Sequence, residues 1–395
     1  MIDRVSFENF KSLENVSLDL GRLTVLVGQN GSGKSSVLQG IYLLSQMRLT
    51  RMSEARTASE HLRSTFSGAR DPRRLVGRER PTVLRLGMRD SGGDEISLTI
   101  NIPAQSDDEP FESGPRFSMA LNGPLTRLSS SIPSSLPREQ NEALKFLKDA
   151  RVGQVLSVVY LHLDANEMAR MSSSEDEVPR MREDGSGLAS TLAWMKGAAE
   201  DELAGITSDL ARIVPGVKRI RTRRARLPRS RLEQLNIDGQ PVWRPVNETV
   251  LGDRFEIEFD EGPPVPADLL SEGTVLALGL LTKLREPGRP RLVLLDDIDR
   301  GLHIEAQANF VRVLRDLMKL DPELQIVCTT HSPYLLDLFE PDEVRVLALD
   351  SSRRTRALPL KAHPEFDKWK FGTQTGELWA ALGSAWVVAP PEPTP

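Results

Sequence analysis

The residues from Gly28 to Ser35 have the spacing of a loop that binds the phosphates of a nucleoside triphosphate. They match GxxxxGK[ST] in full, directly after an apolar strand at 23–27 and directly before a helix at about 34–46. The glycines let backbone N–H groups point at phosphate oxygens, while the Lys34 amine reaches the outer phosphates and the Ser35 hydroxyl binds Mg²⁺. We expect these residues to contact ATP: Gly28, Asn30, Gly31, Ser32, Gly33, Lys34, Ser35 and Ser36.

Two carboxylates follow a second apolar strand much later in the chain. The run Leu292–Leu295 ends in Asp296 and Asp297. A parallel strand carries its last residue to the edge of the sheet where the phosphate loop lies, so Asp296 is expected to bind Mg²⁺ there. Asp297 is then the candidate general base for the attacking water. Taken alone, the pair also fits an Asp-rich turn that caps the next helix.

Two further motifs flank the acidic strand. Before it, Ser271 and Gly273 precede an apolar helix at about 275–284, and a helix N-terminus of this kind offers a hydroxyl and free N–H groups to a phosphate. An ordinary serine cap is the structural alternative. After the acidic strand, a buried strand at 326–329 leads to His331, which we expect to hydrogen-bond the γ-phosphate.

The order of these motifs resembles that of ABC-class ATPases of the RecF, SMC and OLD lineage, including stand-alone prokaryotic members labelled AAA-family ATPases. FENFKSLENVSLDL resembles the opening strands of that lineage, LLSEGT its signature, LLDDIDRGLH its Walker B motif and D-loop, and TTHSP its switch histidine. The resemblance implies that two subunits dock head to tail with ATP between them. Ser271 and Gly273 would then act on the ATP of the neighbouring subunit.

The sequence departs from this family at two points. Asp297 stands where the family usually has a glutamate, and its shorter side chain reaches less far toward water, so we expect slow hydrolysis. No residue is assigned as the Q-loop glutamine, because Gln46 lies too close to the phosphate-loop helix.

Members of this family differ in what their ATPase controls. The stretch after His331 is too short for the TOPRIM nuclease domain of OLD proteins, and the Pro- and Gly-broken middle excludes the long coiled coil of SMC proteins. We therefore expect an ATPase that acts through a separately encoded effector protein or through nucleic acid, with anti-phage defence as an analogy. A structural ATP-binding scaffold and a RecF-like DNA repair ATPase remain the alternatives.

Composition sets outer limits on the class of protein. Among 395 residues, Lys and Arg total 51 and Asp and Glu total 56, so the net charge of −5 excludes nucleic-acid binding through overall charge but allows a local basic patch. We find no signal peptide and no apolar run that could span a membrane, and we expect a cytoplasmic protein. The single cysteine, Cys328, excludes a disulfide within the chain.

The elements that position the motifs predict an α/β P-loop ATPase head with a mostly parallel sheet, an antiparallel β subdomain and an α+β insertion. We expect a mobile loop, with almost nothing apolar to bury, at Met171–Gly187, and one helix over about Leu188–Val214. The predicted regions are the N-terminal part of the head at 1–104, an insertion at 105–265, the C-terminal part at 266–387 and a disordered tail at 388–395.

The insertion contains a basic segment, Lys218–Arg231, in which eight cationic residues occur without an acid. Alternation over 219–223 would place several guanidinium groups on one face of a strand, which suits DNA or RNA. A second arginine-rich stretch at 70–80 supports this. A solvated strand, pairing with the acidic stretch Gln105–Pro115, and an acidic protein partner remain alternatives.

Overall fold

The computed structural model divides the chain into two compact units. The first comprises Met1–Tyr160, Pro290–Asp299 and Met318–Pro395, and the second comprises Leu161–Arg289 and Arg300–Leu317. The structure describes residues 1–46, 80–89, 95–102, 118–122, 157–237, 240–369 and 372–388. The predicted acidic stretch at 105–115, the residues 70–79 of the second arginine-rich stretch and all but the first residue of the predicted tail lie outside them.

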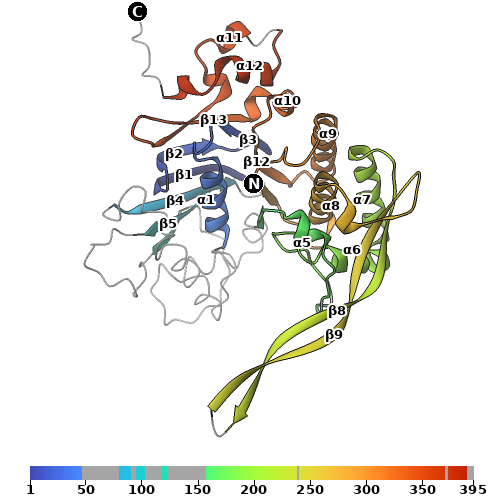
Figure 1. Ribbon diagram of the computed structural model, residues 1–395. Coiled ribbons are helices and arrows are strands. Elements are labelled where there is room, and N and C mark those ends of the chain that lie inside the picture. Colours follow the sequence, from blue (N-terminus) through green and yellow to red (C-terminus); the bar gives the residue numbers. More distant parts are fainter. Residues whose placement is uncertain are drawn as a thin grey trace, which may run out of the picture. The chain divides into compact units, whose positions relative to one another are not determined.

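A six-stranded sheet forms the centre of the first unit (Figure 1). Its strands, in spatial order, are β14 (Thr355–Pro359), β13 (Val344–Leu349), β3 (Leu23–Gly28), β12 (Gln325–Thr329), β11 (Leu292–Leu295) and β7 (Val158–Leu161). The pairs β13–β3, β3–β12 and β12–β11 are parallel, and every residue of β3, β11 and β12 is buried. Strands covered on both faces carry continuous apolar runs, which is why the sequence pattern identified them correctly.

A second, antiparallel sheet packs with the helix that follows the phosphate loop. Its strands are β2 (Leu13–Asp19), β1 (Ile2–Phe10), β4 (Thr82–Arg89), β5 (Glu95–Ile102) and β6 (Ser118–Asn122). Helix α1 (Lys34–Gln46) contributes Leu38 and Ile41 to one apolar core that also contains Phe7 of β1 and Leu294 of β11. The mostly parallel sheet and the antiparallel subdomain confirm the predicted fold class.

Gln325, at the start of β12, ties the two sheets of this unit together. Its amide oxygen accepts from the N–H of Ile2 at 3.1 Å, and its amide nitrogen donates to the carbonyls of Ile2 and Gly21 at 2.8 Å each. A buried amide is costly unless it is hydrogen-bonded, and here both ends are satisfied. Short helices complete the unit: α10 (Pro333–Leu336), α11 (Phe366–Trp369), α12 (Thr375–Leu382), and the 3₁₀ turns η6 (Pro341–Glu343), η7 (Leu360–Ala362) and η8 (Ala385–Val387).

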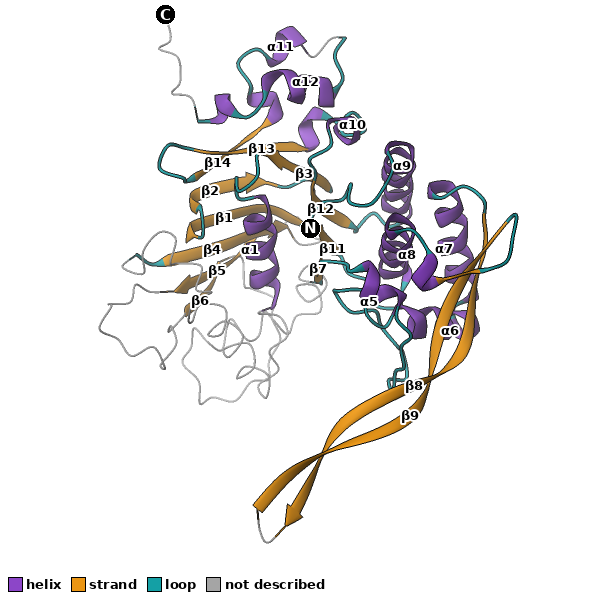
Figure 2. Ribbon diagram, viewed as in Figure 1, coloured by secondary structure: helices purple, strands orange, loops and turns teal. Residues whose placement is uncertain are grey.

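The second unit combines helices with a long β-hairpin (Figure 2). Its elements are α5 (Ala165–Ala169), α6 (Leu188–Ala198), α7 (Glu200–Ile213), β8 (Val217–Ile237), β9 (Gln240–Phe259), β10 (Val265–Pro266), η5 (Ala267–Leu269), α8 (Glu272–Arg285) and most of α9 (Ile304–Leu320). Strands β8 and β9 pair antiparallel along nearly their whole length. Within the residues that the structure describes, no helix is both long and apolar enough to span a membrane.

The single helix predicted over Leu188–Val214 is wrong, because Ala199 separates α6 from α7. Ala199 has φ −149° and ψ 53°, outside the helical region, while its N–H still bonds to the carbonyl of Met195. Gly197, two residues before the break, weakens the helix locally, whereas Ala198 and Ala199 themselves favour helical geometry. The apolar stripe continues across the break, with Leu192 and Leu210 both fully buried.

The segment Met171–Gly187 has more to bury than the sequence suggested. The side chain of Met181 is 1% exposed, and its backbone N–H donates to Glu286 at 3.2 Å. Ser172 forms an isolated antiparallel bridge with Asp253. These contacts hold the segment against α8 and β9 of the same unit.

Cys328 provides a test of the central sheet, because it is the single cysteine of the chain and its side chain is fully buried in β12. Burial raises the pKa of its thiol, so the reactive thiolate does not form in the folded protein. We expect no reaction of native protein with Ellman's reagent, even at about pH 9, above the usual thiol pKa of about 8.5. One equivalent should react after unfolding in guanidinium. Stoichiometric labelling of native protein would contradict the buried position.

Candidate nucleotide-binding site

The phosphate loop is built where β3 ends against β13 and β14. Gly28 has φ 151°, and a Cβ there would lie 2.1 Å from the carbonyl oxygen of Leu347, so only glycine fits. A Cβ on Gly33 would lie 2.5 Å from Oγ1 of Thr355, which donates to the carbonyl of Ser32 at 3.0 Å. Thr355 thus supports the loop from β14, a role that the sequence did not reveal.

The first turn of α1 presents its N–H groups beyond this loop. Its first intrahelical bond runs from Val37 to the carbonyl of Gly33 at 3.0 Å, and no acidic residue occupies the first turn. The preceding N–H groups lack intrahelical partners and lie at the positive end of the helix dipole, an arrangement that binds anions. Ser35 and Ser36 are half-buried there, whereas Gly31 and Asn30 are exposed.

Lys34 and Ser32 are the buried polar groups of the loop. Lys34 is 6% exposed, and its amine donates to the carbonyls of Gly28 at 2.9 Å and Gln29 at 3.1 Å. Burial lowers the pKa of Lys34, and the nearby carboxylates of Asp297 and Asp296 act in the opposite direction. The Ser32 hydroxyl is buried without a hydrogen-bond partner among the described residues. A buried group of this kind calls for a polar ligand.

The two aspartates reach the same sheet edge through strand register. Leu295 of β11 lies opposite Cys328 of β12, which lies opposite Val25 of β3, so Asp296 and Asp297 emerge at the same sheet edge as the phosphate loop, one strand away from β3. Their shared partner is Thr329, the last residue of β12. Its hydroxyl donates to Oδ1 of Asp296 at 2.7 Å and accepts from the backbone N–H of Asp297 at 2.8 Å.

Asp297 occupies a strained backbone conformation beside His331. Its φ of 52° is in the left-handed region, which non-glycine residues rarely adopt and which clusters at functional sites. Nε2 of His331 lies 3.7 Å from Oδ1 of Asp297, too far for a direct hydrogen bond, and both side chains are about half exposed. The predicted base and the predicted γ-phosphate sensor are therefore neighbours that remain open to solvent.

Tyr160, at the end of β7, is a second residue that the sequence analysis missed. Its hydroxyl donates to Oδ2 of Asp296 at 3.1 Å, and burial together with that carboxylate raises the pKa of the phenol. Gln39 of α1 also bonds the Tyr160 hydroxyl and accepts in turn from the amine of Lys11. Thr329 and Tyr160 together engage both oxygens of Asp296 and fix its orientation.

The predicted signature residues lie in the second unit. Ser271 is the N-cap of α8, and its hydroxyl accepts from the N–H of Thr274 at 3.3 Å. A Cβ on Gly273 would lie 2.2 Å from the carbonyl oxygen of Gly301, so Gly273 is required by its own chain. Arg300 pairs with Glu272 at 3.0 Å. The capping role is thus real, and the role toward a neighbouring ATP stays a prediction.

The basic segment pairs largely with β9. Arg221 pairs with Glu258 at 2.5 Å, and Arg223 pairs with Glu256 at 2.8 Å. The carboxylates that face these arginines therefore come from the same hairpin. Within the described part of the chain, Arg219 and Arg226 show no ion pair, and the expected nucleic-acid contact stays a prediction.

Comparisons with known proteins agree with this arrangement. The family model AAA_21, described as "AAA domain, putative AbiEii toxin, Type IV TA system", matches residues 23–337. The chain is 22% identical to an OLD nuclease of Thermus scotoductus, over 90% of this chain and 63% of that protein. It is 40% identical to the DNA replication and repair protein RecF of Hahella chejuensis, over 15% of this chain and 16% of that protein.

A solved structure shares the fold. The Smc head bound to the C-winged helix domain of ScpA matches with a TM-score of 0.54 and 14% sequence identity, over 91% of this chain and 98% of that one. The sequence matches confirm the predicted resemblance to ATPases of the RecF, SMC and OLD lineage. The chain spans less than two thirds of the length of the OLD nuclease and of RecF.

Thr329 should act as a positioning residue for both aspartates. Thr329→Val removes the hydroxyl and keeps the shape, and a hydrogen bond to a charged group contributes about 1.5–3 kcal/mol. We therefore expect kcat for ATP hydrolysis to fall by about ten- to a hundredfold, with nucleotide affinity little changed. Thr24→Val, in the neighbouring strand β3, is the matched control, since the Thr24 hydroxyl bonds to Gly21 instead. Equal losses in both variants would indicate general destabilisation.

Proposed function

The chain belongs to the AAA_21 family and is an ATPase of the AAA/ABC type, and from this premise we propose that it hydrolyses ATP slowly with Mg²⁺, using ATP-driven head-to-tail dimerisation to control a separate effector. One observation carries the proposal. Asp296 and Asp297 emerge from the strand next but one to the phosphate-loop strand, and both act on the pKa of Lys34. This arrangement brings a cation that can bind phosphate close to one carboxylate that can bind the metal ion and another that can act as a base.

The donor set of the loop fits a triphosphate with its metal ion. Lys34 and the N–H groups of the first turn of α1 would hold phosphate oxygens, and the partnerless Ser32 hydroxyl would gain a partner. Ser35 and Asp296 would hold Mg²⁺, which prefers oxygen ligands. When bound, Mg²⁺ would offset negative charge on the phosphates.

Asp297 would take the proton of the attacking water, and His331 would contact the γ-phosphate. The backbone of Asp297 is in the left-handed region, and its N–H donates to the Thr329 hydroxyl, which fixes the backbone that carries this carboxylate. The aspartate side chain is one methylene shorter than the usual glutamate, which supports slow turnover. A slow ATPase suits a switch whose ATP-bound state must persist.

The partner of the switch is proposed as a separately encoded protein. The family description places this kind of AAA domain, as a putative toxin, within a TA system, and a system of more than one component fits a partner outside the chain. The role in anti-phage defence remains part of the proposal by analogy.

Solution mass tests the switch. We expect the mass measured by light scattering to double when Mg²⁺-ATP is added to wild-type protein, and Lys34→Ala to stay monomeric because it loses the phosphate contact. Asp297→Asn should bind ATP, stop hydrolysing it and accumulate as the dimer, since only the base is lost. If the wild-type mass is indifferent to ATP and neither the wild-type protein nor Asp297→Asn measurably hydrolyses it, ATP is a structural ligand and the proposal fails.

Complementation tests whether each site uses two subunits. Ser271→Asp keeps a cap for α8, because aspartate is also a good N-cap, but places a negative charge where a neighbour's phosphate would lie. We expect Lys34→Ala and Ser271→Asp each to be inactive alone and to recover hydrolysis when mixed. The mixed dimer contains one site with an intact loop and an intact signature. Normal hydrolysis by Ser271→Asp alone would place Ser271 outside the site, and absence of recovery between two folded, inactive variants would contradict a site shared by two subunits. Gly273→Ala is a poorer test, since its Cβ would strike Gly301.

A further inference from the structure

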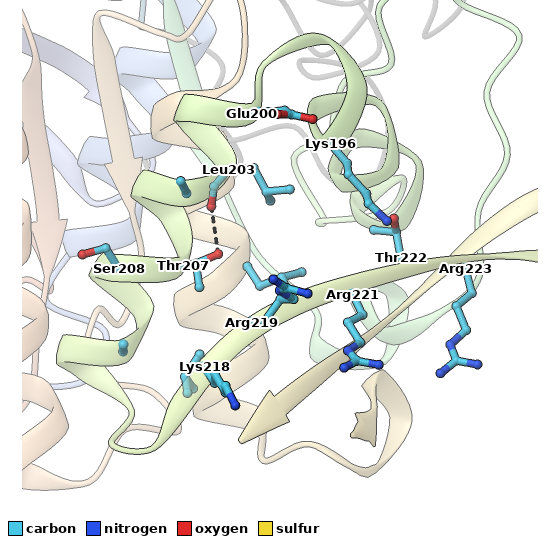
Figure 3. Close-up of a pocket in the computed structure, with 14 residues that line it drawn as sticks. Lys196, Glu200, Leu203, Thr207, Ser208, Lys218, Arg219, Arg221, Thr222 and Arg223 are labelled. Carbon is cyan, nitrogen blue, oxygen red and sulfur yellow. Dashed lines mark hydrogen bonds between the residues drawn. The ribbon is translucent and has the colours of Figure 1, made fainter. Parts of the chain in front are cut away.

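A groove in the second unit lies between helix α7 and strand β8 (Figure 3), and the signature residues Ser271 and Gly273 are not among those that line it. Its volume is about 970 Å³. One wall is a single face of α7, because Glu200, Ala204, Ser208 and Ala211 recur at helical spacing. The other wall is the continuous stretch of β8 from 217 to 223.

The groove runs along the edge of β8. The side chains of neighbouring strand residues point to opposite faces, yet all seven residues from 217 to 223 line the groove. The groove therefore lies along the hydrogen-bonding edge of β8 and not over one of its faces. In the three-stranded sheet β10–β9–β8, β8 is outermost and has no second partner strand among the described residues. Its outward N–H and C=O groups are therefore a template for another strand.

The rim of the groove is predominantly cationic. Among the described residues that line it, Glu200 is the sole carboxylate, against these cationic side chains: Lys196, Lys218, Arg219, Arg221 and Arg223. Arg221 and Arg223 already pair with Glu258 and Glu256, whereas Arg219 has no ion pair in the described part of the chain. Positive charge thus surrounds a free strand edge.

The side chains between these charges, which form the floor of the groove, are mostly apolar, and Thr207, Ser208 and Thr222 add hydroxyl groups. Val217 and Ile220 are buried, and the side chains of Leu203, Ala204 and Ala211 leave room beside α7. An occupant can therefore alternate apolar side chains toward the floor with acidic side chains toward the rim.

We propose that this groove binds an extended acidic segment of a partner protein, which adds to β8 as a further antiparallel or parallel strand. Strand addition derives affinity from main-chain hydrogen bonds and specificity from alternate side chains. Seven residues of β8 extend over about 23 Å, so the bound segment has about seven residues. The groove supplies a docking surface that is separate from the ATP site.

The chemistry of the groove favours a peptide over nucleic acid. No aromatic side chain lines it for base stacking among the described residues. Two of its arginines are already paired with Glu258 and Glu256, which leaves few cations for a backbone with a charge on every nucleotide, whereas a peptide also gains hydrogen bonds from the strand edge. Nucleic acid is the competing outcome of the test.

The test measures fluorescence anisotropy of a labelled peptide of alternating glutamate and valine, about seven residues long, with full-length protein. We expect saturable binding that weakens with salt. A peptide with lysine in place of glutamate should not bind, and one with a central proline should bind at least about tenfold more weakly, since proline removes a ladder donor. Single-stranded and duplex DNA of the same label serve as the competing probes.

Two matched pairs of variants locate the site. Ala204→Trp fills the groove, and Ala198→Trp adds the same bulk at an exposed helical position outside it. Arg219→Glu reverses a charge in the groove, and Arg226→Glu reverses one on the same strand beyond it. We expect the peptide to lose about tenfold or more in affinity with Ala204→Trp and Arg219→Glu only.

Several results would overturn the proposal. These are no saturable binding of the acidic peptide, equal binding of the lysine or proline peptides, or equal losses from the control variants. DNA binding that falls equally in Arg219→Glu and Arg226→Glu would assign the hairpin to nucleic acid. ATP hydrolysis should be unchanged in all four variants, so failure here is distinct from failure of the proposed ATPase switch.

Discussion

The parallel pairing of β3, β12 and β11 is the constraint on which the candidate site depends. Each strand is buried throughout, and the register sets Leu295 opposite Cys328 and Cys328 opposite Val25. Residues that lie far apart in the sequence therefore leave the sheet at one edge. The register also delivers the Thr329 hydroxyl between Asp296 and the N–H of Asp297. A slip of one residue would turn these groups to the other face of the sheet and dismantle the site.

The sequence predicted what is encoded locally. Two motifs can be recognised from adjacent residues alone: the loop from Gly28 to Ser35 and the aspartates after Leu292–Leu295. The structure brings these two motifs together. The sequence analysis did not identify three residues that support the site: Thr329, Tyr160 and Thr355. Each acts through a partner on a different element, and that pairing is set only by the three-dimensional register. The sequence analysis missed the helix break at Ala199 for another reason. Alanine favours helices, so its departure from helical geometry reflects packing in the unit and not propensity.

The hairpin shows a similar division between local and distant information. Alternation over 219–223 correctly indicated a strand, but it covers a small part of β8 (Val217–Ile237). Carboxylates of β9, Glu256 and Glu258, pair with Arg223 and Arg221 across the hairpin, a pairing that the alternation within 219–223 alone did not indicate. One face of the hairpin base carries the charged side chains, and the other buries Ile220, Phe255 and Ile257. The base can therefore pack on one side and stay hydrated on the other.

That anchorage at one end has a mechanical consequence. Ile220 and Ile257 are buried near the base of the hairpin, while Trp243 and Leu251 farther along β9 are 59% and 68% exposed. The part of β9 from Gln240 to Leu251 has about 12 residues, a length of about 40 Å. A rotation of about 10° at the base would therefore carry the far end through about 7 Å. The hairpin is a lever arm, which converts small rearrangements among the helices at its root into large displacements at its tip.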